Sequence, residues 1–353
     1  EYRPIFVDIP DPDLVNQFDL YVIDGSNQRL EHPAFFIVLA RSALVRFRYT
    51  KDLSTNEVYS ILKKDLSGIV LVDGNIFNDD IELYVEKQKT SPEGTVEVLR
   101  YIREGKEFPI LTRYNPDRDV KVPSSQALGF GVRYQQTLEL AMLEHIPLDK
   151  KAVVIRDGPL FSTSVSPRDT IDGLSKTYQW KNQILVSVSK RIGESSLITE
   201  LLLQLSQLRE AWFPGQEIND TTLKKLASDQ LILSRILKPG YRTPLIEAVG
   251  RARSSIVEEQ EDLAPLACYY MSRQIPNTII RMEIPKFMWD KNKDFVNIAI
   301  SLVAWQLDLG LKAPYIQLVA DEQSQLNSEI LSLKYQATAK LYEKNLTFPE
   351  VFI

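Results

Sequence analysis

Three strand-like apolar runs in this chain stop at an Asp-Gly pair, and this feature constrains the fold more than any other. The three segments are VIDGSN at 22–27, LVDGN at 71–75 and VIRDGPL at 154–160. Asp-Gly after a strand is typical of a tight turn, because glycine tolerates positive φ and aspartate can bond its own backbone. The same arrangement also brings a carboxylate to the end of a sheet, where a metal ion can bind. The pattern alone leaves both interpretations open for Asp24, Asp73 and Asp157.

Composition excludes several kinds of site. The 353 residues are 44% apolar and 25% charged, which are globular values that allow a sizeable core. The single cysteine, Cys268, excludes an intramolecular disulfide and a cysteine-based zinc site. The two histidines, His32 and His145, lie far apart in the sequence, which argues against a histidine-based zinc hydrolase or a Ser-His-Asp triad.

Charge and hydropathy predict the compartment and the kinds of partner of the protein. The net charge of −5 argues against a basic coat but permits a local basic channel for nucleic acid. No apolar run reaches the roughly 18–20 residues that span a bilayer. The first residues lack the pattern of a signal peptide. We therefore expect a cytoplasmic protein with no membrane partner.

The pattern along the chain indicates a mixed α/β fold. Strands are predicted at 19–24, 35–49, 68–73, 151–157 and 183–190, and a strand hairpin within 268–285. Helices are predicted at 55–65, 93–105, 126–146, 168–178, 293–309 and about 315–344, with a loop at 109–125. The charged helical stretch at about 193–265 has no linker-like flanks, so we interpret it as an insertion into one domain.

Three carboxylates in this pattern are candidates for chemistry. Asp24 is predicted to end the first strand, and Glu139 lies in the helix that precedes the strand ending at Asp157. Such an all-oxygen cluster suits Mg²⁺ or Mn²⁺, and paired ions about 4 Å apart support phosphodiester cleavage. A turn aspartate and a solvated helical glutamate are the ordinary alternatives, and the residues alone do not decide between them.

Six short segments, taken in order, resemble the NurA family of prokaryotic nucleases. They are VIDGSN, YQQTLELAMLE, VIRDGPL, VSVSK, IIRMEIP and APYIQLVADEQ, and together they span roughly residues 19–335. The resemblance implies an RNase H-like fold, with a mixed sheet flanked by helices and a helical insertion. It also implies a single nuclease domain over 1–353, whose core covers about 19–192 and 266–345.

The resemblance implies a set of catalytic residues that hold two Mn²⁺ or Mg²⁺ ions. The set is Asp24, Glu139, Asp157 and Asp321. The family's Arg-x-Glu-x-Pro strand matches Arg281, Glu283 and Pro285. Many relatives carry a histidine where this chain has Asp321, which is still a ligand type for a hard divalent ion. Asp73 matches no family motif, so we interpret it as a turn residue.

Four residues are candidates for nucleic-acid binding. Lys190 matches the basic residue that closes a strand in the family, and Tyr315 matches the tyrosine of its Pro-Tyr pair. Arg46 and Arg48 lie on one face of a predicted strand and can meet phosphates. The alternatives are a surface ion pair for Lys190, a core position for Tyr315 and a solvated sheet face for the arginines.

The resemblance also implies a biological role. It implies a metal-dependent deoxyribonuclease with 5′-to-3′ exonuclease and single-strand endonuclease activity, acting on single strands and duplex ends in DNA end processing and repair. It further implies a homodimer and a hexameric HerA-type ATPase partner. A non-catalytic subunit of a translocase complex, and an RNase H-fold enzyme that acts on RNA or in strand transfer, are the alternative functions.

Overall fold

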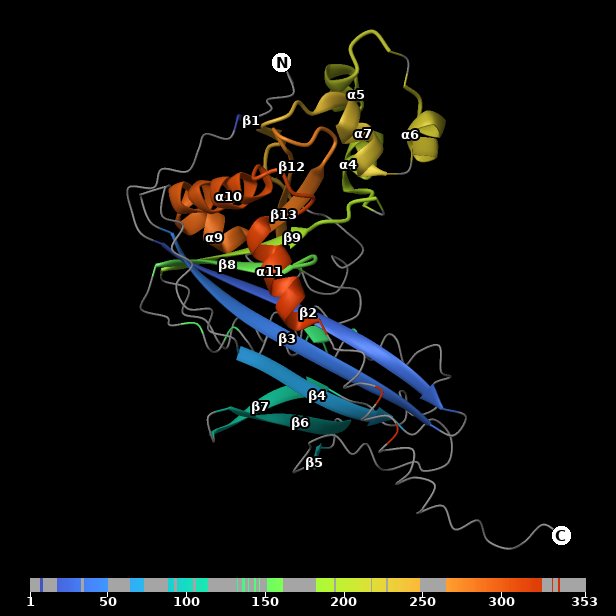
Figure 1. Cartoon of the computed structure of the whole chain (residues 1–353). Coiled ribbons are helices and arrows are strands. Elements are labelled where there is room, and N and C mark those ends of the chain that lie inside the picture. Colours follow the sequence, from blue (N-terminus) through green and yellow to red (C-terminus); the bar gives the residue numbers. More distant parts are fainter. Residues whose placement is uncertain are drawn as a thin grey trace, which may run out of the picture. The chain divides into compact units, whose positions relative to one another are not determined.

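The computed structural model of the chain forms two compact units, which are described separately (Figure 1). The first unit comprises 1–24, 44–63 and 144–320, and the second comprises 25–43, 64–143 and 321–353. The structure describes residues 7–8, 18–32, 35–49, 64–72, 88–91, 94–103, 106–113, 151–160, 182–193, 195–216, 218–226, 228–247 and 265–325, and isolated positions at 132, 135, 136, 139, 143, 146, 332 and 336.

A mixed sheet forms the centre of the first unit. Its strand order is β1-β10-β12-β13-β9-β8-β2, with β11 beside β12. The pairs β2–β8 and β8–β9 are parallel, whereas β9, β13, β12 and β10 pair antiparallel in turn. The strands are β1 Val7–Asp8, β2 Phe18–His32, β8 Ala152–Asp157, β9 Gln183–Ser189, β10 Tyr241–Arg242, β11 Ile246–Glu247, β12 Pro265–Met271 and β13 Ile279–Pro285.

The parallel strands are apolar along nearly their whole length because both of their faces are covered. Residues 152–156 of β8 and 183–188 of β9 are buried without alternation. Continuous burial of this kind is typical of parallel strands between two layers. The two-layer burial explains why the sequence pattern predicted 151–157 and 183–190 correctly.

Helices cover this sheet. The helix α10, Lys293–Leu307, packs against β9, and α9, Lys286–Lys291, packs against β13 (Figure 1). Asn292 begins α10 by accepting a hydrogen bond from the backbone N–H of Phe295 at 3.0 Å, as an N-cap residue does. The helix α11, Tyr315–Ser324, follows α10. The predicted helix at 293–309 is confirmed, and so is the start of the one predicted at 315.

In its described part, the stretch predicted to be helical contains the short strands β10 and β11 as well as four helices. The helices are α4 Leu197–Gln204, α5 Ser206–Trp212, α6 Asp220–Leu226 and α7 Asp229–Ile236. Their buried side chains share one apolar cluster with Tyr269, Met271 and Ile279 of the β12–β13 pair. The stretch therefore packs directly on the sheet of its own unit.

The second unit continues two strands and holds a separate small sheet. The Gly25–His32 part of β2 is followed in strand order by β3, Phe35–Tyr49, and β4, Lys64–Val72. A second antiparallel sheet has the order β5-β6-β7. Its strands are β5 Gln88–Ser91, β6 Gly94–Arg103 and β7 Lys106–Arg113. The mixed α/β class with helices on a mixed sheet is thus confirmed.

The predicted helix at 93–105 is wrong, because Gly94–Arg103 forms strand β6. The segment is rich in residues that favour strands, such as Val96, Val98 and Ile102, and these alternate along part of its length. Its neighbour β7 pairs with it in register from Val96 to Arg103. Pairing with an adjacent strand therefore overrides the helical spacing of the apolar residues.

Three further predicted boundaries are wrong. Residues 109–113, predicted as loop, belong to β7, where Pro109 is tolerated because β7 is the last strand in its sheet. Lys64 and Asp65, predicted as the end of a helix, begin β4. The helix predicted to reach 146 ends earlier, since Leu143 lies in a 3₁₀ turn and Ile146 in a bend.

Some predictions fall outside the described residues. These are the helix at 168–178, the turn at Asp73, and most of the helix predicted at 55–65. Within the described residues, no helix has the length and the apolar character needed to cross a membrane.

Candidate active site

Two neighbouring parallel strands place Asp24 and Asp157 at the same level of the sheet. In the β2–β8 register Ile23 pairs with Arg156, so the next residue on each strand is an aspartate. The expectation that the first strand ends at Asp24 is wrong, because β2 continues to His32. Gly25 does not adopt positive φ, so Asp24 lies within a continuous strand and not at a hairpin turn.

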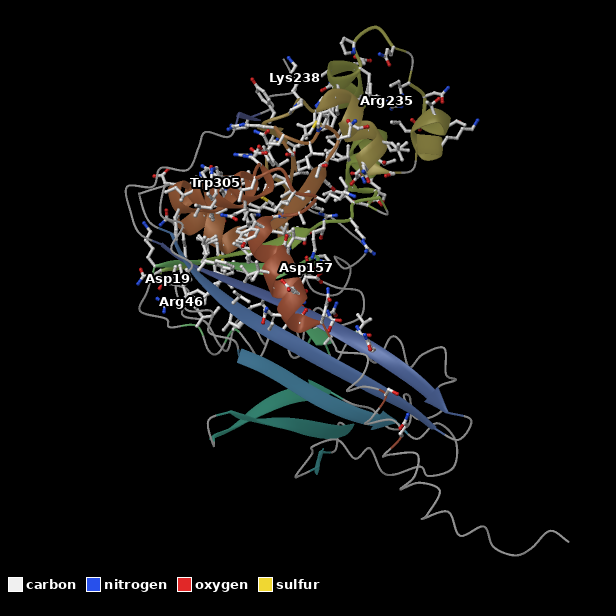
Figure 2. All side chains as sticks on the ribbon, viewed as in Figure 1. Asp19, Arg46, Asp157, Arg235, Lys238 and Trp305 are labelled. Carbon is white, nitrogen blue, oxygen red and sulfur yellow. The ribbon has the colours of Figure 1, made fainter. Side chains whose placement is uncertain are left out.

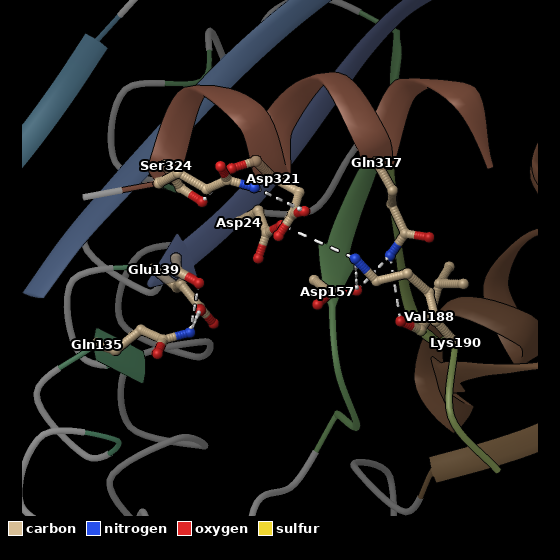
Figure 3. A network of polar contacts seen from close by, with 11 residues as sticks. Asp24, Gln135, Glu139, Asp157, Val188, Lys190, Gln317, Asp321 and Ser324 are labelled. Carbon is tan, nitrogen blue, oxygen red and sulfur yellow. Dashed lines mark hydrogen bonds and ion pairs between the residues drawn. The ribbon is translucent and has the colours of Figure 1, made fainter. Parts of the chain in front are cut away.

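The side chain of Lys190 joins the two carboxylates (Figure 3). Its Nζ lies 3.2 Å from Asp157 Oδ1 and 4.0 Å from Asp24 Oδ2. Asp24 is almost fully buried, at 2% exposure, whereas Asp157 is partly exposed. The mutual repulsion of two such close carboxylates is offset by a positive charge, and one ammonium group supplies it here.

Gln317 on α11 holds the Asp157 side chain from another direction (Figure 3). Its Nε2 donates hydrogen bonds to Asp157 Oδ1 at 2.8 Å and to the backbone oxygen of Val188 at 3.2 Å. Val188 is the partner of Asp157 in the β8–β9 register. The buried amide of Gln317 therefore ties the carboxylate to the neighbouring strand.

The turn after Asp157 is held by buried charged groups. Gly158 has φ of 88°, a conformation that favours glycine, and its N–H donates to the oxygen of Val188 at 3.0 Å. The N–H of Leu160 donates to Glu283 Oε2 at 2.6 Å, and its oxygen accepts from Arg156 Nη1 at 3.3 Å. Arg156 is buried beside this turn and holds its backbone through this contact.

In the second unit, Glu139 lies against Gly25, the residue that follows Asp24 in the chain. A Cβ on Gly25 would lie 2.6 Å from Glu139 Oε1 and 2.6 Å from Gln135 Cγ. Gln135 Nε2 donates to Glu139 Oε1 and to the Gly25 oxygen, each at 2.8 Å (Figure 3). Glu139 is buried, so the alternative of a solvated helical glutamate does not hold.

Asp321 begins the part of α11 that belongs to the second unit. Its backbone oxygen accepts from Ser324 Oγ at 3.0 Å, and the Ser324 oxygen in turn accepts from Ser26 Oγ. This contact joins α11 to β2 within the unit. Among the described residues, no three His, Cys, Asp or Glu side chains are grouped closely enough to hold a metal ion.

The predicted nucleic-acid contacts have different surroundings. Tyr315 is exposed at the start of α11, so the alternative of a core tyrosine does not hold. Arg46 Nη2 forms an ion pair with Asp19 Oδ2 at 2.7 Å, and both residues are labelled in Figure 2. The side chain of Arg48 lies outside the described residues. DNA binding by Lys190, Tyr315, Arg46 and Arg48 remains a prediction.

The sequence interpretation missed two glutamines, Gln135 and Gln317. Each lies four residues before a predicted ligand on a helix, Glu139 and Asp321 respectively. Residues four apart on a helix share one face. A polar amide one turn before a candidate carboxylate was therefore the available signal.

A family model described as the NurA domain matches residues 18–304 of this chain. The crystal structure of the NurA nuclease from Sulfolobus solfataricus is 12% identical, with a TM-score of 0.46, over 98% of this chain and 89% of that one. A structure of NurA with manganese is 9% identical, with a TM-score of 0.45, over 95% and 91%. A structure of NurA bound to dAMP and manganese is 9% identical, with a TM-score of 0.39, over 91% and 87%. No curated protein matches the sequence.

Proposed function

Because this chain belongs to the NurA family, we propose that it is a metal-dependent deoxyribonuclease. Asp24, Glu139, Asp157 and Asp321 hold two Mn²⁺ or Mg²⁺ ions in this proposal. The solved structures named for NurA with manganese and with dAMP support a divalent metal and a nucleotide ligand in relatives. The sequence of this chain supplies only oxygen ligands at the four positions.

One observation carries the proposal, namely that Lys190 lies between Asp24 and Asp157. Distances of 3.2 and 4.0 Å from one ammonium nitrogen mean that both carboxylates face a common positive charge. Carboxylate oxygens are the ligands that Mg²⁺ and Mn²⁺ prefer. The donor set therefore fits a hard divalent ion, and it does not fit zinc bound by histidine or cysteine.

The residues of this chain have separate tasks in the proposed reaction. Bound metal would supply activated water and charge stabilisation at the leaving oxygen. Gln317 holds Asp157 in orientation through its 2.8 Å hydrogen bond. Lys190 moves from the carboxylates toward a substrate phosphate, because a flexible ammonium binds either anion. Tyr315, which is exposed, stacks on a base or contacts the strand.

The finer parts of the proposal come from the family. We expect 5′-to-3′ exonuclease and single-strand endonuclease activity, a homodimer, and a HerA-type ATPase as partner in cytoplasmic DNA end processing. The strand order β9-β8-β2 in the first unit and β2-β3-β4 in the second supports an RNase H-like core. We also retain the proposal of one nuclease domain with an insertion at about 193–265.

The test is cleavage of end-labelled DNA with and without Mn²⁺. Single-stranded DNA, duplex DNA, RNA and an RNA–DNA hybrid are compared with wild-type protein and with Asp24→Asn and Asp157→Asn. We expect DNA cleavage that depends on Mn²⁺ and falls at least about 100-fold in each variant, because each removes a charged oxygen ligand. The size of the labelled products reports polarity.

The matched control is Asp220→Asn, which removes an exposed carboxylate paired with Arg209 in the helical stretch. It should cleave as wild type does. Wild-type protein that binds Mn²⁺ but cleaves no nucleic acid would favour the non-catalytic subunit instead. Preferential cleavage of RNA would favour the RNA-directed alternative. Light scattering and co-purification with a HerA-type ATPase test the dimer and the partner.

A further inference from the structure

The backbone of Leu160 is held on both sides by buried charged side chains. Its N–H donates to Glu283 at 2.6 Å, and its oxygen accepts from Arg156 at 3.3 Å. Glu283 and Arg156 are both buried, and the Leu160 side chain is fully buried. Hydrogen bonds to charged groups are stronger than neutral ones. The short turn from Asp157 to Leu160 therefore has a fixed end three residues beyond the carboxylate.

Glu283 is itself held by Arg281, which lies two residues before it on β13. Arg281 Nη2 forms an ion pair with Glu283 Oε1 at 2.5 Å, so the two carboxylate oxygens of Glu283 have different partners. Burial alone would lower the pKa of Arg281, but Glu283, Tyr269 and Asp229 together raise this pKa above its ordinary value. The guanidinium therefore stays charged, and its ion pair with Glu283 Oε1 leaves Glu283 Oε2 to accept from Leu160.

The contacts continue from Arg281 to the helical stretch. Arg281 Nη1 donates to Ser195 Oγ at 3.1 Å, and Ser195 Oγ donates to Asp229 Oδ2 at 2.5 Å. Tyr269 OH donates to the same Asp229 oxygen at 2.6 Å. Asp229 is the first residue of α7 and is fully buried. A continuous set of buried and partly buried polar contacts thus links α7 to the turn after Asp157.

We infer that Glu283 is a positioning residue for Asp157: it fixes the Asp157–Leu160 turn by accepting the Leu160 N–H and thereby sets where the Asp157 carboxylate lies. The inference rests on the proposed function for its consequence, because Asp157 is a metal ligand only in that proposal. The restraint on the turn is a property of the metal-free protein and can be measured without activity.

Glu283 has the stronger restraint on this turn, because its bond to Leu160 is short and charged at 2.6 Å. The Arg156 contact is longer, at 3.3 Å, and reaches the Leu160 carbonyl. This carbonyl belongs to the next peptide unit, one step farther from Asp157 than the Leu160 N–H. Gly158 offers no compensating side chain, and a Cβ there would meet nothing within 4 Å. Loss of the Glu283 acceptor therefore frees the Leu160 end of the turn, while the Gly158 N–H still donates to the oxygen of Val188.

The experiment compares Glu283→Leu with Glu283→Gln in the full chain. Leucine removes the acceptor, whereas glutamine keeps an oxygen that can accept the Leu160 N–H. We measure amide hydrogen exchange of the 157–160 segment in metal-free protein, and Mn²⁺ affinity by calorimetry. For Glu283→Leu we expect at least about 10-fold faster exchange and about 10- to 100-fold weaker Mn²⁺ binding, as for other residues that orient ligands. Glu283→Gln should remain within a few-fold of wild type in both.

Asp308→Leu is the matched control for lost stability. Asp308 also accepts a backbone N–H, from Arg273 at 2.8 Å, and a tyrosine hydroxyl, from Tyr270 at 2.5 Å. Its loss should lower the melting temperature without changing exchange at 157–160 or Mn²⁺ affinity. Equal losses of Mn²⁺ affinity in Asp308→Leu and Glu283→Leu would overturn the inference, since the effect would then be general.

The remaining outcomes separate the inference from the proposed function. Unchanged exchange of the turn in folded Glu283→Leu overturns the inference, whatever the activity. Faster exchange with unchanged Mn²⁺ affinity also overturns it, because the turn would then not set the position of a ligand. Wild-type protein that neither binds Mn²⁺ nor cleaves DNA contradicts the proposed function itself. If Glu283→Leu does not fold, two variants replace it: Glu283→Ala, which also removes the acceptor, and Arg281→Lys, which alters the ion pair that holds Glu283.

Discussion

At Gly25, an added Cβ atom would clash with the side chain of Glu139, a candidate metal ligand. The Cβ of an alanine would lie 2.6 Å from both Glu139 Oε1 and Gln135 Cγ. These atoms belong to side chains, so the carboxylate moves and the backbone need not. The requirement for glycine here is close approach and not positive φ, in contrast to Gly158.

Gly25→Ala should therefore damage activity more than stability. We expect at least about 10-fold loss of Mn²⁺ affinity and of DNA cleavage, because Glu139 is displaced, with a melting temperature that changes by only a few degrees. Calorimetry, cleavage assays and thermal unfolding measure the three quantities. Gly193→Ala is the control, since a Cβ there would meet only Gln230 Oε1, at 3.8 Å. Equal activities in both variants would contradict the tight fit.

We predict that loss of the Lys190 charge has opposite effects on the affinity for Mn²⁺ and on the affinity for DNA. Lys190→Met removes the ammonium that competes for Asp24 and Asp157, so Mn²⁺ should bind several-fold more tightly. The same variant should bind DNA more weakly and cleave it more slowly, because a phosphate contact is lost. Lys190→Arg keeps the charge and should restore DNA binding. Weaker Mn²⁺ binding in Lys190→Met would show that the lysine supports the metal site.

At the level of helices and strands, Asp229 at the start of α7 caps the N-terminus of another helix, α4. Its Oδ1 accepts from the N–H groups of Ile198 at 2.9 Å and Thr199 at 3.2 Å, in the first turn of α4. Ser196, which directly precedes α4, makes no capping hydrogen bond with its side chain. A carboxylate at a helix N-terminus is favoured by the exposed N–H groups and the helix dipole.

Asp229→Ala should lower the free energy of unfolding by about 3 kcal/mol, because several buried donors lose their acceptor. Asp229→Asn should cost about half as much, since one oxygen remains. Urea unfolding gives the free energies, and hydrogen exchange over 197–204 shows whether α4 opens first. Asp220→Ala, which removes an exposed ion-pair partner, should cost no more than about 1 kcal/mol. Equal effects of the two alanine variants would contradict the capping role.

Strands were predictable from the sequence where both of their faces are buried along their length. The strands β8 and β9 are largely apolar and buried along nearly their whole length because both faces are covered, and the β12–β13 hairpin shows the same burial. The strand β6 was not predictable, because its identity depends on pairing with β7. The carboxylates were found by type and by family motif. The spacing of Gln135 four residues before Glu139 was visible in the sequence. The contacts of Gln135 with Gly25 and of Gln317 with Asp157 join residues distant in sequence, so the local pattern gave no sign of these two.

For the protein as a whole, burial of Cys268 predicts how stability depends on pH. Burial raises the pKa of the Cys268 thiol from 9.0 to about 11, with Arg242 acting in the opposite direction. Because the raised pKa means that the folded state holds the proton more tightly, this contribution is complete below pH 9. It is lost as pH rises through 11. The thiol should also resist alkylation until the protein unfolds.

The free energy of unfolding should therefore fall by up to about 2–3 kcal/mol between pH 9 and 11, at 1.36 kcal/mol for each pKa unit. In Cys268→Ala this fall should be smaller, although the baseline drops. Burial also raises the pKa of Tyr269, so the two proteins are compared by urea unfolding at pH 9–10, where the thiol dominates. Identical slopes in wild type and Cys268→Ala would contradict the assignment.

The continuity of β2 through Asp24 determines which changes of chain length the protein can tolerate. Residues 20–23 are buried on both faces, so apolar burial alone hardly distinguishes one register from the next. The Asp19–Arg46 ion pair is a polar contact that fixes the register five residues before Asp24. Removing one residue between 20 and 23 would turn the Asp24 side chain to the opposite face while leaving an apolar strand. Deletion scanning should therefore find folded but inactive proteins in this segment. Deletion variants in this segment that fold and stay active would show that β2 restores its register before Asp24.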